Sequence, residues 1–293
     1  MAQKISAVAI PGHRPAGLLT GGTERHGDVG PIGQASVQGV EWFIRKAHHV
    51  ARRGRYHPYF LASDLALGAA VGMSLVVAQL WGGVRWWGLA VPMVLLHLIG
   101  YPLYLRIKLK VVKTAARSFL QDAVLLIIPG LVLMSFALGV SPRAATDYLG
   151  LTLPVMLAIY RVGCLVGGCC FGRASARGIA YRPEHVVMAQ TRWRRFDPGP
   201  APAERVFPLQ LVDAAANVVI ALSLLPLALD TDKQPAVSLL LLYLAGYSTA
   251  RLLLDSFRGH RHRPMRRRLS EAQWTALVLI LLAGVWMGLA ASL

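Results

Sequence analysis

The stretch that decides the fold runs from Asp147 to Cys170 and reads DYLGLTLPVMLAIYRVGCLVGGCC. About 20 apolar residues cross the ~30 Å hydrocarbon core of a bilayer, so this stretch is long enough to span a membrane. It carries Arg161 well inside its apolar part. An arginine at that depth is costly, and therefore indicates either a functional site or a paired partner.

The rest of the chain repeats this pattern. Hydrophobic residues make up 55% of the sequence, and the mean hydropathy is +0.49. They gather into long apolar runs separated by basic loops, whereas a water-soluble helical protein alternates apolar and polar faces on shorter helices. The seven runs are Tyr59–Trp81, Trp86–Leu105, Phe119–Val140, Asp147–Cys170, Pro208–Leu229, Ala236–Leu254 and Trp274–Ala291. The sequence thus predicts an all-α polytopic membrane protein with about seven transmembrane helices.

The amino-terminal part has a different composition. We expect residues 1–57 to form a poorly ordered basic extension and residues 58–293 to form the membrane domain. The apolar stretch Ala7–Pro11 is too short for the core of a signal peptide. Residues 40–55 fit two interpretations, a basic amphipathic helix on anionic headgroups or a solvated linker, and the sequence leaves both open.

Basic residues are distributed unevenly between the two sides of the predicted bundle. Eight Lys and Arg precede Tyr59, and five, seven and six more lie in the segments 106–117, 173–205 and 258–268, all on the same side. The loops on the opposite side hold three Lys and Arg residues. By the positive-inside rule the crowded side is cytoplasmic. The net charge of +17 is therefore read as a topology signal, and no basic–aromatic module indicates a nucleic-acid partner.

Two other spans carry polar stripes. In the fifth span Gln210, Asp213 and Asn217 fall at i, i+3 and i+7, and so share one helix face. In the sixth span the stripe consists of Tyr243, Tyr247, Arg251, Asp255 and Arg258. Such groups cannot face lipid unpaired, so both stripes and Arg161 predict a common polar interior.

Two interpretations of that interior remain open. Arg161 and Arg251, next to glycines and tyrosines, are suited to a bidentate phosphate clamp with room for the headgroup of an anionic phospholipid. Alternatively, Arg161 pairs with Asp213 and Arg251 with Asp255 only to hold the helices in register.

Three blocks of this sequence resemble the main motifs of the prolipoprotein diacylglyceryl transferase family, in the same order and on consecutive spans. They are residues 161–173 (RVGCLVGGCCFGR), 208–213 (PLQLVD) and 247–258 (YSTARLLLDSFR). Asp147 also lies where the family tends to have an aspartate. The resemblance extends over roughly residues 59–291 and is strong from 147 to 259.

The resemblance implies a multi-pass enzyme of the bacterial inner membrane. It would move diacylglyceryl from phosphatidylglycerol, or another anionic phospholipid, to the lipobox cysteine of a prolipoprotein and release glycerol phosphate. Arg161 and Arg251 match the family's two essential arginines. The expected substrate-binding residues are Gly172, Gln210, Asp213, Tyr247, Asp255 and Arg258.

The sequence departs from the family pattern at the catalytic base. The expected histidine-glycine pair of the third span is absent, and Phe119–Asp122 stands at about that place. His97 is the histidine that lies within a span, and it is our candidate base. A structural histidine is the alternative. A second function class, a non-enzymatic phospholipid-binding or lipid-moving membrane protein that has lost the base, therefore stays open.

The three cysteines are Cys164, Cys169 and Cys170. Their spacing differs from CxxC, and adjacent cysteines fit one tetrahedral metal poorly, so we expect small packing residues, no metal site and no cofactor. A disulfide stays open if this end faces an oxidising compartment.

Reporter fusions test the topology. The charge distribution predicts that reporters at Arg182 and Arg263 lie in the cytoplasm and that one after Leu293 lies outside. In the family that the sequence resembles, the signature side faces away from the cytoplasm. The reverse labelling pattern would show that this orientation overrides charge bias here.

Overall fold

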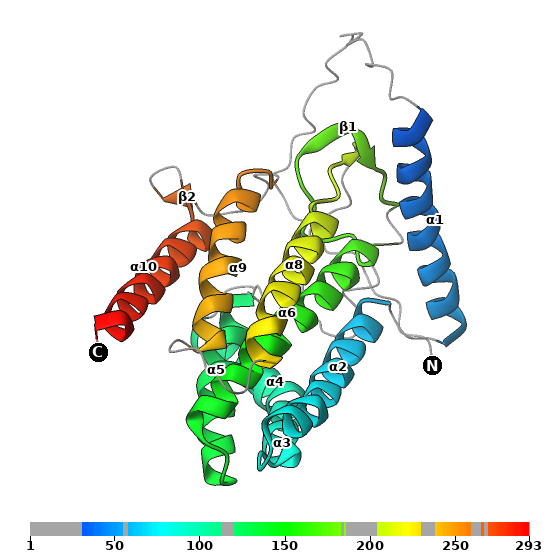
Figure 1. Cartoon of the computed structure of the whole chain (residues 1–293). Coiled ribbons are helices and arrows are strands. Elements are labelled where there is room, and N and C mark those ends of the chain that lie inside the picture. Colours follow the sequence, from blue (N-terminus) through cyan, green and yellow to red (C-terminus); the bar gives the residue numbers. More distant parts are fainter. Residues whose placement is uncertain are drawn as a thin grey trace.

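The computed structural model describes residues 31–54, 58–112, 120–182, 185, 204–229, 238–258, 265–266 and 269–292. Most of these residues are helical (Figure 1). The helices are α1 (Pro31–Gly54), α2 (Pro58–Trp81), α3 (Trp86–Leu95), the π-helical η1 (Leu96–Gly100), α4 (Tyr101–Val112), α5 (Leu120–Ala137), α6 (Pro142–Val166), α8 (Leu209–Leu229), α9 (Leu239–Asp255) and α10 (Glu271–Ser292). The strands are β1 (Ala174–Ile179) and the antiparallel pair β2 (Met265–Arg266) and β3 (Leu269–Ser270).

The predicted all-α polytopic membrane fold is confirmed. Each of the seven apolar runs overlaps a helix or, for the second, the continuous helical stretch from α3 through η1 to α4. By length and composition four described helical segments can cross a membrane, namely Pro58–Trp81, Trp86–Lys108, Pro142–Val166 and Leu209–Leu229. The described apolar stretches of α5 and α10 are shorter, at Leu125–Ala137 and Ala272–Trp286.

The fourth helix is shifted from its predicted position, because its ends are set by capping and not by hydropathy. α6 begins after Ser141, whose hydroxyl accepts a hydrogen bond from the Ala144 amide, with Pro142 in the first turn. It ends at Val166 with Gly167 as its C-cap, and Gly168 follows with a φ of +62°. The cysteines at 169 and 170 consequently lie in a turn beyond the helix.

α6 is the central helix of the bundle. Fifteen of its 25 residues are buried, compared with seven of 21 in α8. It packs against α2, α5, α8 and α9. The polar residues on its carboxyl-terminal half therefore lie inside the protein.

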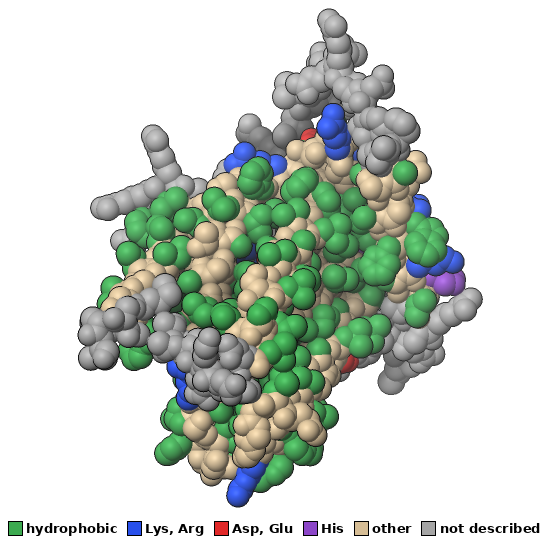
Figure 2. Space-filling model, viewed as in Figure 1, with side chains coloured by type: hydrophobic (Ala, Val, Ile, Leu, Met, Phe, Trp, Pro, Cys, Tyr) green, Lys and Arg blue, Asp and Glu red, His purple; other side chains and the backbone are tan. Residues whose placement is uncertain are grey.

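The outer surface of the bundle is apolar. Figure 2 shows hydrophobic side chains spread over the visible face, with Lys and Arg side chains near its edges. On α8 and α10, Val219, Leu222, Leu281 and Leu282 each expose 60% or more of their surface. A band of this kind is stable against lipid and not against water, which agrees with a multi-pass membrane protein.

Two close contacts fix α6 against its neighbours. A Cβ at Gly163 would lie 2.8 Å from the Cβ of Ala62 on α2. At the other end, a Cβ at Gly150 would overlap the backbone of Leu239 at the start of α9. Asp147 Oδ1 accepts a hydrogen bond of 2.7 Å from the Leu239 amide. Asp147 thus caps α9, at the end of α6 opposite Arg161.

Part of the predicted extension is a packed helix. In α1, Ile44 is buried against Leu165 and Val166, and the ring of His48 lies 2.6 Å from the Val166 carbonyl oxygen. Trp42 stays exposed on the outer face, with the Lys46 ammonium 5.8 Å from its ring. Residues 1–30 and 55–57 of the predicted extension lie outside the described residues.

Candidate active site

A carboxylate and three arginines meet where α6, α8 and α9 approach one another. Asp213 Oδ2 lies 2.7 Å from Arg161 Nε, 3.3 Å from Arg251 Nη1 and 3.8 Å from Arg258 Nη2. The Asp213 side chain is 2% exposed. The three predicted motifs therefore supply one cluster, which we call the arginine cluster: Arg161, Asp213, Arg251, Asp255 and Arg258.

Asp255 is the second acid of the arginine cluster. Its Oδ1 lies 3.6 Å from Arg251 Nη2, and its Oδ2 accepts a hydrogen bond from the Ser270 hydroxyl. Both ion pairs of the purely structural interpretation, Arg161–Asp213 and Arg251–Asp255, are thus formed. Arg258 also lies 3.8 Å from Asp213, so the arginine cluster contains more than these two pairs.

A layer of tyrosines and one asparagine supports the cluster. Arg161 Nη2 donates a 3.2 Å hydrogen bond to the Tyr247 hydroxyl. Asn217 Nδ2 donates to Asp213 Oδ1 and its Oδ1 accepts from the Tyr243 hydroxyl, both at 3.2 Å. The Tyr243 and Tyr247 rings stack with centroids 5.7 Å apart. These contacts restrict Asp213 and Arg161 more than their ion pair alone does.

Gln210 holds the turn after α6. Its Nε2 donates to the Cys169 carbonyl oxygen at 2.7 Å and to the Tyr181 hydroxyl at 3.3 Å. The Tyr181 hydroxyl in turn donates to the Leu165 carbonyl oxygen. Gln210 shares a helix face with Asp213, but its amide group contacts the turn.

Gly172 joins the three motif segments through the backbone. Its amide donates to the Phe207 carbonyl oxygen at 2.9 Å, and the Arg173 amide donates to the Phe257 carbonyl oxygen at 3.0 Å. A Cβ at Gly172 would lie 3.0 Å from Phe207 Cβ and 3.1 Å from the Phe257 oxygen. Glycine is needed here because two chain segments close around it.

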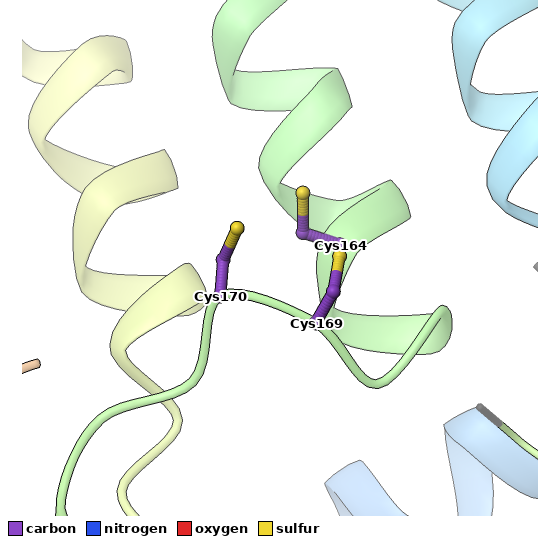
Figure 3. A group of neighbouring side chains, drawn as sticks. All are labelled: Cys164, Cys169 and Cys170. Atoms are coloured by element: carbon purple, nitrogen blue, oxygen red, sulfur yellow. The ribbon is translucent and has the colours of Figure 1, made fainter. Parts of the chain in front are cut away.

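The three cysteines converge although two of them are adjacent in sequence (Figure 3). The sulfur atoms of Cys164, Cys169 and Cys170 all lie within 4.8 Å of one another. Cys164 and Cys169 are buried, whereas Cys170 is exposed. Cys170 lies beyond α6, and its hydrogen bonds with the other two thiols, together with the positive charges of Arg258 and Arg161, hold its pKa well below the ordinary value.

His97 lies in a different polar group. Its Nε2 is 3.2 Å from the Ser63 hydroxyl on α2, and its Nδ1 is 3.3 Å from the Tyr160 hydroxyl on α6. Within the described part of the chain, no hydrogen bond or ion pair links His97 to the arginine cluster. The side chain of Asp122 lies outside the described residues.

A comparison of the sequence with known protein families gives a match that includes every residue of the arginine cluster. The sequence model of the prolipoprotein diacylglyceryl transferases matches residues 119–289, which is more than half of the chain. The chain belongs to the prolipoprotein diacylglyceryl transferase family. No curated protein matches it in a sequence search. Membership supports a transferase role in lipoprotein biosynthesis within a membrane, and the matched residues include the arginine cluster but not His97.

One contact of the cluster was not predicted. Ser270, the residue directly before α10, donates a hydrogen bond to Asp255 and also caps α10. Its hydroxyl accepts from the Gln273 amide at 3.2 Å, and Gln273 Oε1 accepts from the Ser270 amide at 3.0 Å. The sequence signal was the reciprocal capping pattern Ser270-Glu-Ala-Gln273.

We expect Gly172→Ala to lower the free energy of unfolding by about 1–3 kcal/mol, because the added methyl group overpacks the junction. Thermal unfolding of detergent-solubilised protein measures this change. Gly68→Ala is the matched control, since a Cβ there meets nothing within 4 Å and alanine favours the helix. Equal stability of the two variants would contradict the close packing at Gly172.

Proposed function

We propose that the protein is a phosphatidylglycerol-dependent diacylglyceryl transferase that modifies the lipobox cysteine of prolipoproteins. The observation that carries the proposal is the convergence of three guanidiniums on Asp213 inside the bundle, among them Arg251, whose side chain is 13% exposed. Guanidiniums bind phosphate oxygens through paired N–H donors, so a group of them favours a phosphate ligand. In this proposal the phosphate of a lipid headgroup binds to the arginine cluster while its acyl chains remain among the helices.

The reaction is a substitution at the glyceryl carbon that carries the phosphate ester. The acceptor sulfur forms a bond to this carbon, the carbon–oxygen bond breaks, and its electron pair stays on the phosphate oxygen. The leaving glycerol phosphate carries one more negative charge than the phosphodiester did. Arginines already fixed around the phosphate stabilise the transition state more than the ground state, because the charge grows as the bond breaks.

The contacts of the cluster suggest different roles for the two arginines. Arg161 is held tightly, by the 2.7 Å contact with Asp213 and by Tyr247. Arg251 has longer contacts of 3.3 and 3.6 Å, and its side chain is 13% exposed. We therefore assign Arg251 to capture of the phosphate and Arg161 to fixing its position. Asp213 positions both.

The acceptor thiol must lose its proton. With an ordinary pKa of about 8.5 it is mostly protonated near neutral pH, so a nearby base speeds the attack. We assign this role to His97. Its two ring nitrogens lie near hydroxyls of Ser63 and Tyr160, and Tyr160 directly precedes Arg161 on α6.

Transfer from labelled phosphatidylglycerol to a lipobox peptide tests the clamp. Arg161→Ala and Arg251→Ala should each lower the single-turnover rate by about 10²-fold or more, since each removes a donor to the developing charge. Arg251→Lys, which keeps the charge and loses the planar fork, should recover only part of the rate. Arg143→Ala is the control, because Arg143 pairs with Asp147 at the other end of α6.

Full transfer by Arg161→Ala or Arg251→Ala would reduce the cluster to a structural role. No transfer by the unmutated protein with any anionic phospholipid, combined with retained lipid binding, would favour the non-enzymatic lipid-binding alternative.

The base is tested separately by the pH dependence of the same rate. His97→Ala should lower the rate near neutral pH by about 10²-fold or more, and raising the pH should restore part of it by ionising the acceptor thiol directly. His49→Ala, the same change at an exposed position of α1, is the control. An unchanged rate in His97→Ala would remove His97 from the mechanism.

A further inference from the structure

The cysteine cluster has a geometry that the spacing of its residues does not suggest. Gly168 and Cys170 have φ values of +62° and +59°, and these two left-handed residues turn the chain so that the sulfurs of Cys169 and Cys170 both face Cys164 (Figure 3). A left-handed conformation costs a non-glycine residue roughly 1 kcal/mol or more. Strained backbone of this kind persists where the surrounding structure holds it, often at functional sites.

We propose that Cys164, Cys169 and Cys170 form a trithiolate site for a soft d¹⁰ metal ion, with Cu(I) as the bound ion. Cysteine sulfur selects soft ions such as Cu(I) over magnesium or calcium. Around one ion with metal–sulfur bonds of ~2.3 Å, three ligand sulfurs lie about 4 Å apart. The sulfurs here are within 4.8 Å of one another, so small side-chain adjustments close the site.

The number of ligands favours copper over zinc. Structural zinc sites have four protein ligands in a tetrahedron. Among the described residues, the group of potential ligands contains these three cysteines and no His, Asp or Glu. A three-coordinate site suits Cu(I), which needs no fourth donor.

The surroundings favour entry of the ion. Cys170 is the least buried of the three cysteines and gives the ion a route to the two buried sulfurs. Gln210 already holds the Cys169 carbonyl oxygen. A bound ion would therefore clamp the end of α6 to the turn that leads into Gly172, and this inference does not depend on the transferase activity.

Anaerobic titration of the reduced, untagged full-length protein with Cu(I) tests the site. In competition with a chromogenic Cu(I) chelator, we expect one Cu(I) per chain. X-ray absorption spectroscopy of the loaded protein should count three sulfur neighbours. Zn(II) in a parallel titration should bind more weakly at the same residues.

Cys170→Ser is the decisive variant, because its side chain is exposed and the change leaves the buried packing intact. It should weaken Cu(I) binding at least tenfold without changing the unfolding temperature of the metal-free protein. Cys164→Ser should weaken binding as well.

Several results would overturn the proposal: no stoichiometric uptake, uptake unchanged in Cys170→Ser, or fewer than three sulfur neighbours. Tighter binding of Zn(II) than of Cu(I) would overturn the choice of ion. A thiol assay that finds one reactive thiol in protein isolated under nitrogen would indicate a disulfide in place of the metal site.

Discussion

The rest of the site depends on the buried carboxylate of Asp213. An unpaired charge at this depth costs several kcal/mol, so the acid and the arginines around it can only be buried together. Asp213 sits 2.7 Å from Arg161 and within 4 Å of Arg251 and Arg258, which come from another helix and its end. One acid thus fixes three guanidiniums next to one another.

Close packing of α6 makes this arrangement possible. Gly163 admits α2, and Gly150 admits the first turn of α9, so the helix that carries Arg161 is surrounded on several sides. At its carboxyl end Gly172 allows the segments before α8 and after α9 to meet. The same junction connects the arginine cluster to the cysteine turn, through Gln210 and the Cys169 carbonyl. A change at Gly172 would therefore move the charged groups as well as the backbone.

Much of the fold was predictable, because the bilayer sets both the length and the apolar character of a spanning helix. The polar stripe of α9 also pointed to its partners, since residues such as Arg251 and Asp255 cannot face lipid. Helix ends were less accurate. α6 starts five residues earlier and stops four residues earlier than its apolar run, because Ser141 caps its start and Gly167 and Gly168 end it. A hydropathy profile detects neither the cap at the start of the helix nor the glycines at its end.

The sequence by itself determined the all-α membrane fold, the order of the motifs and the identity of the charged groups that must be buried. The tertiary structure decided which groups pair with one another. Asp213 contacts three arginines, Asp255 also accepts a hydrogen bond from Ser270, and Gln210 donates a hydrogen bond to the Cys169 carbonyl oxygen. The tertiary structure also brought the sulfur of Cys170 beside Cys164. The physical reason is that the periodicity of the sequence determines the helix face on which a side chain lies. The partner of that side chain depends on which helices pack together and on turns of positive φ, and these leave no periodic signal in the sequence.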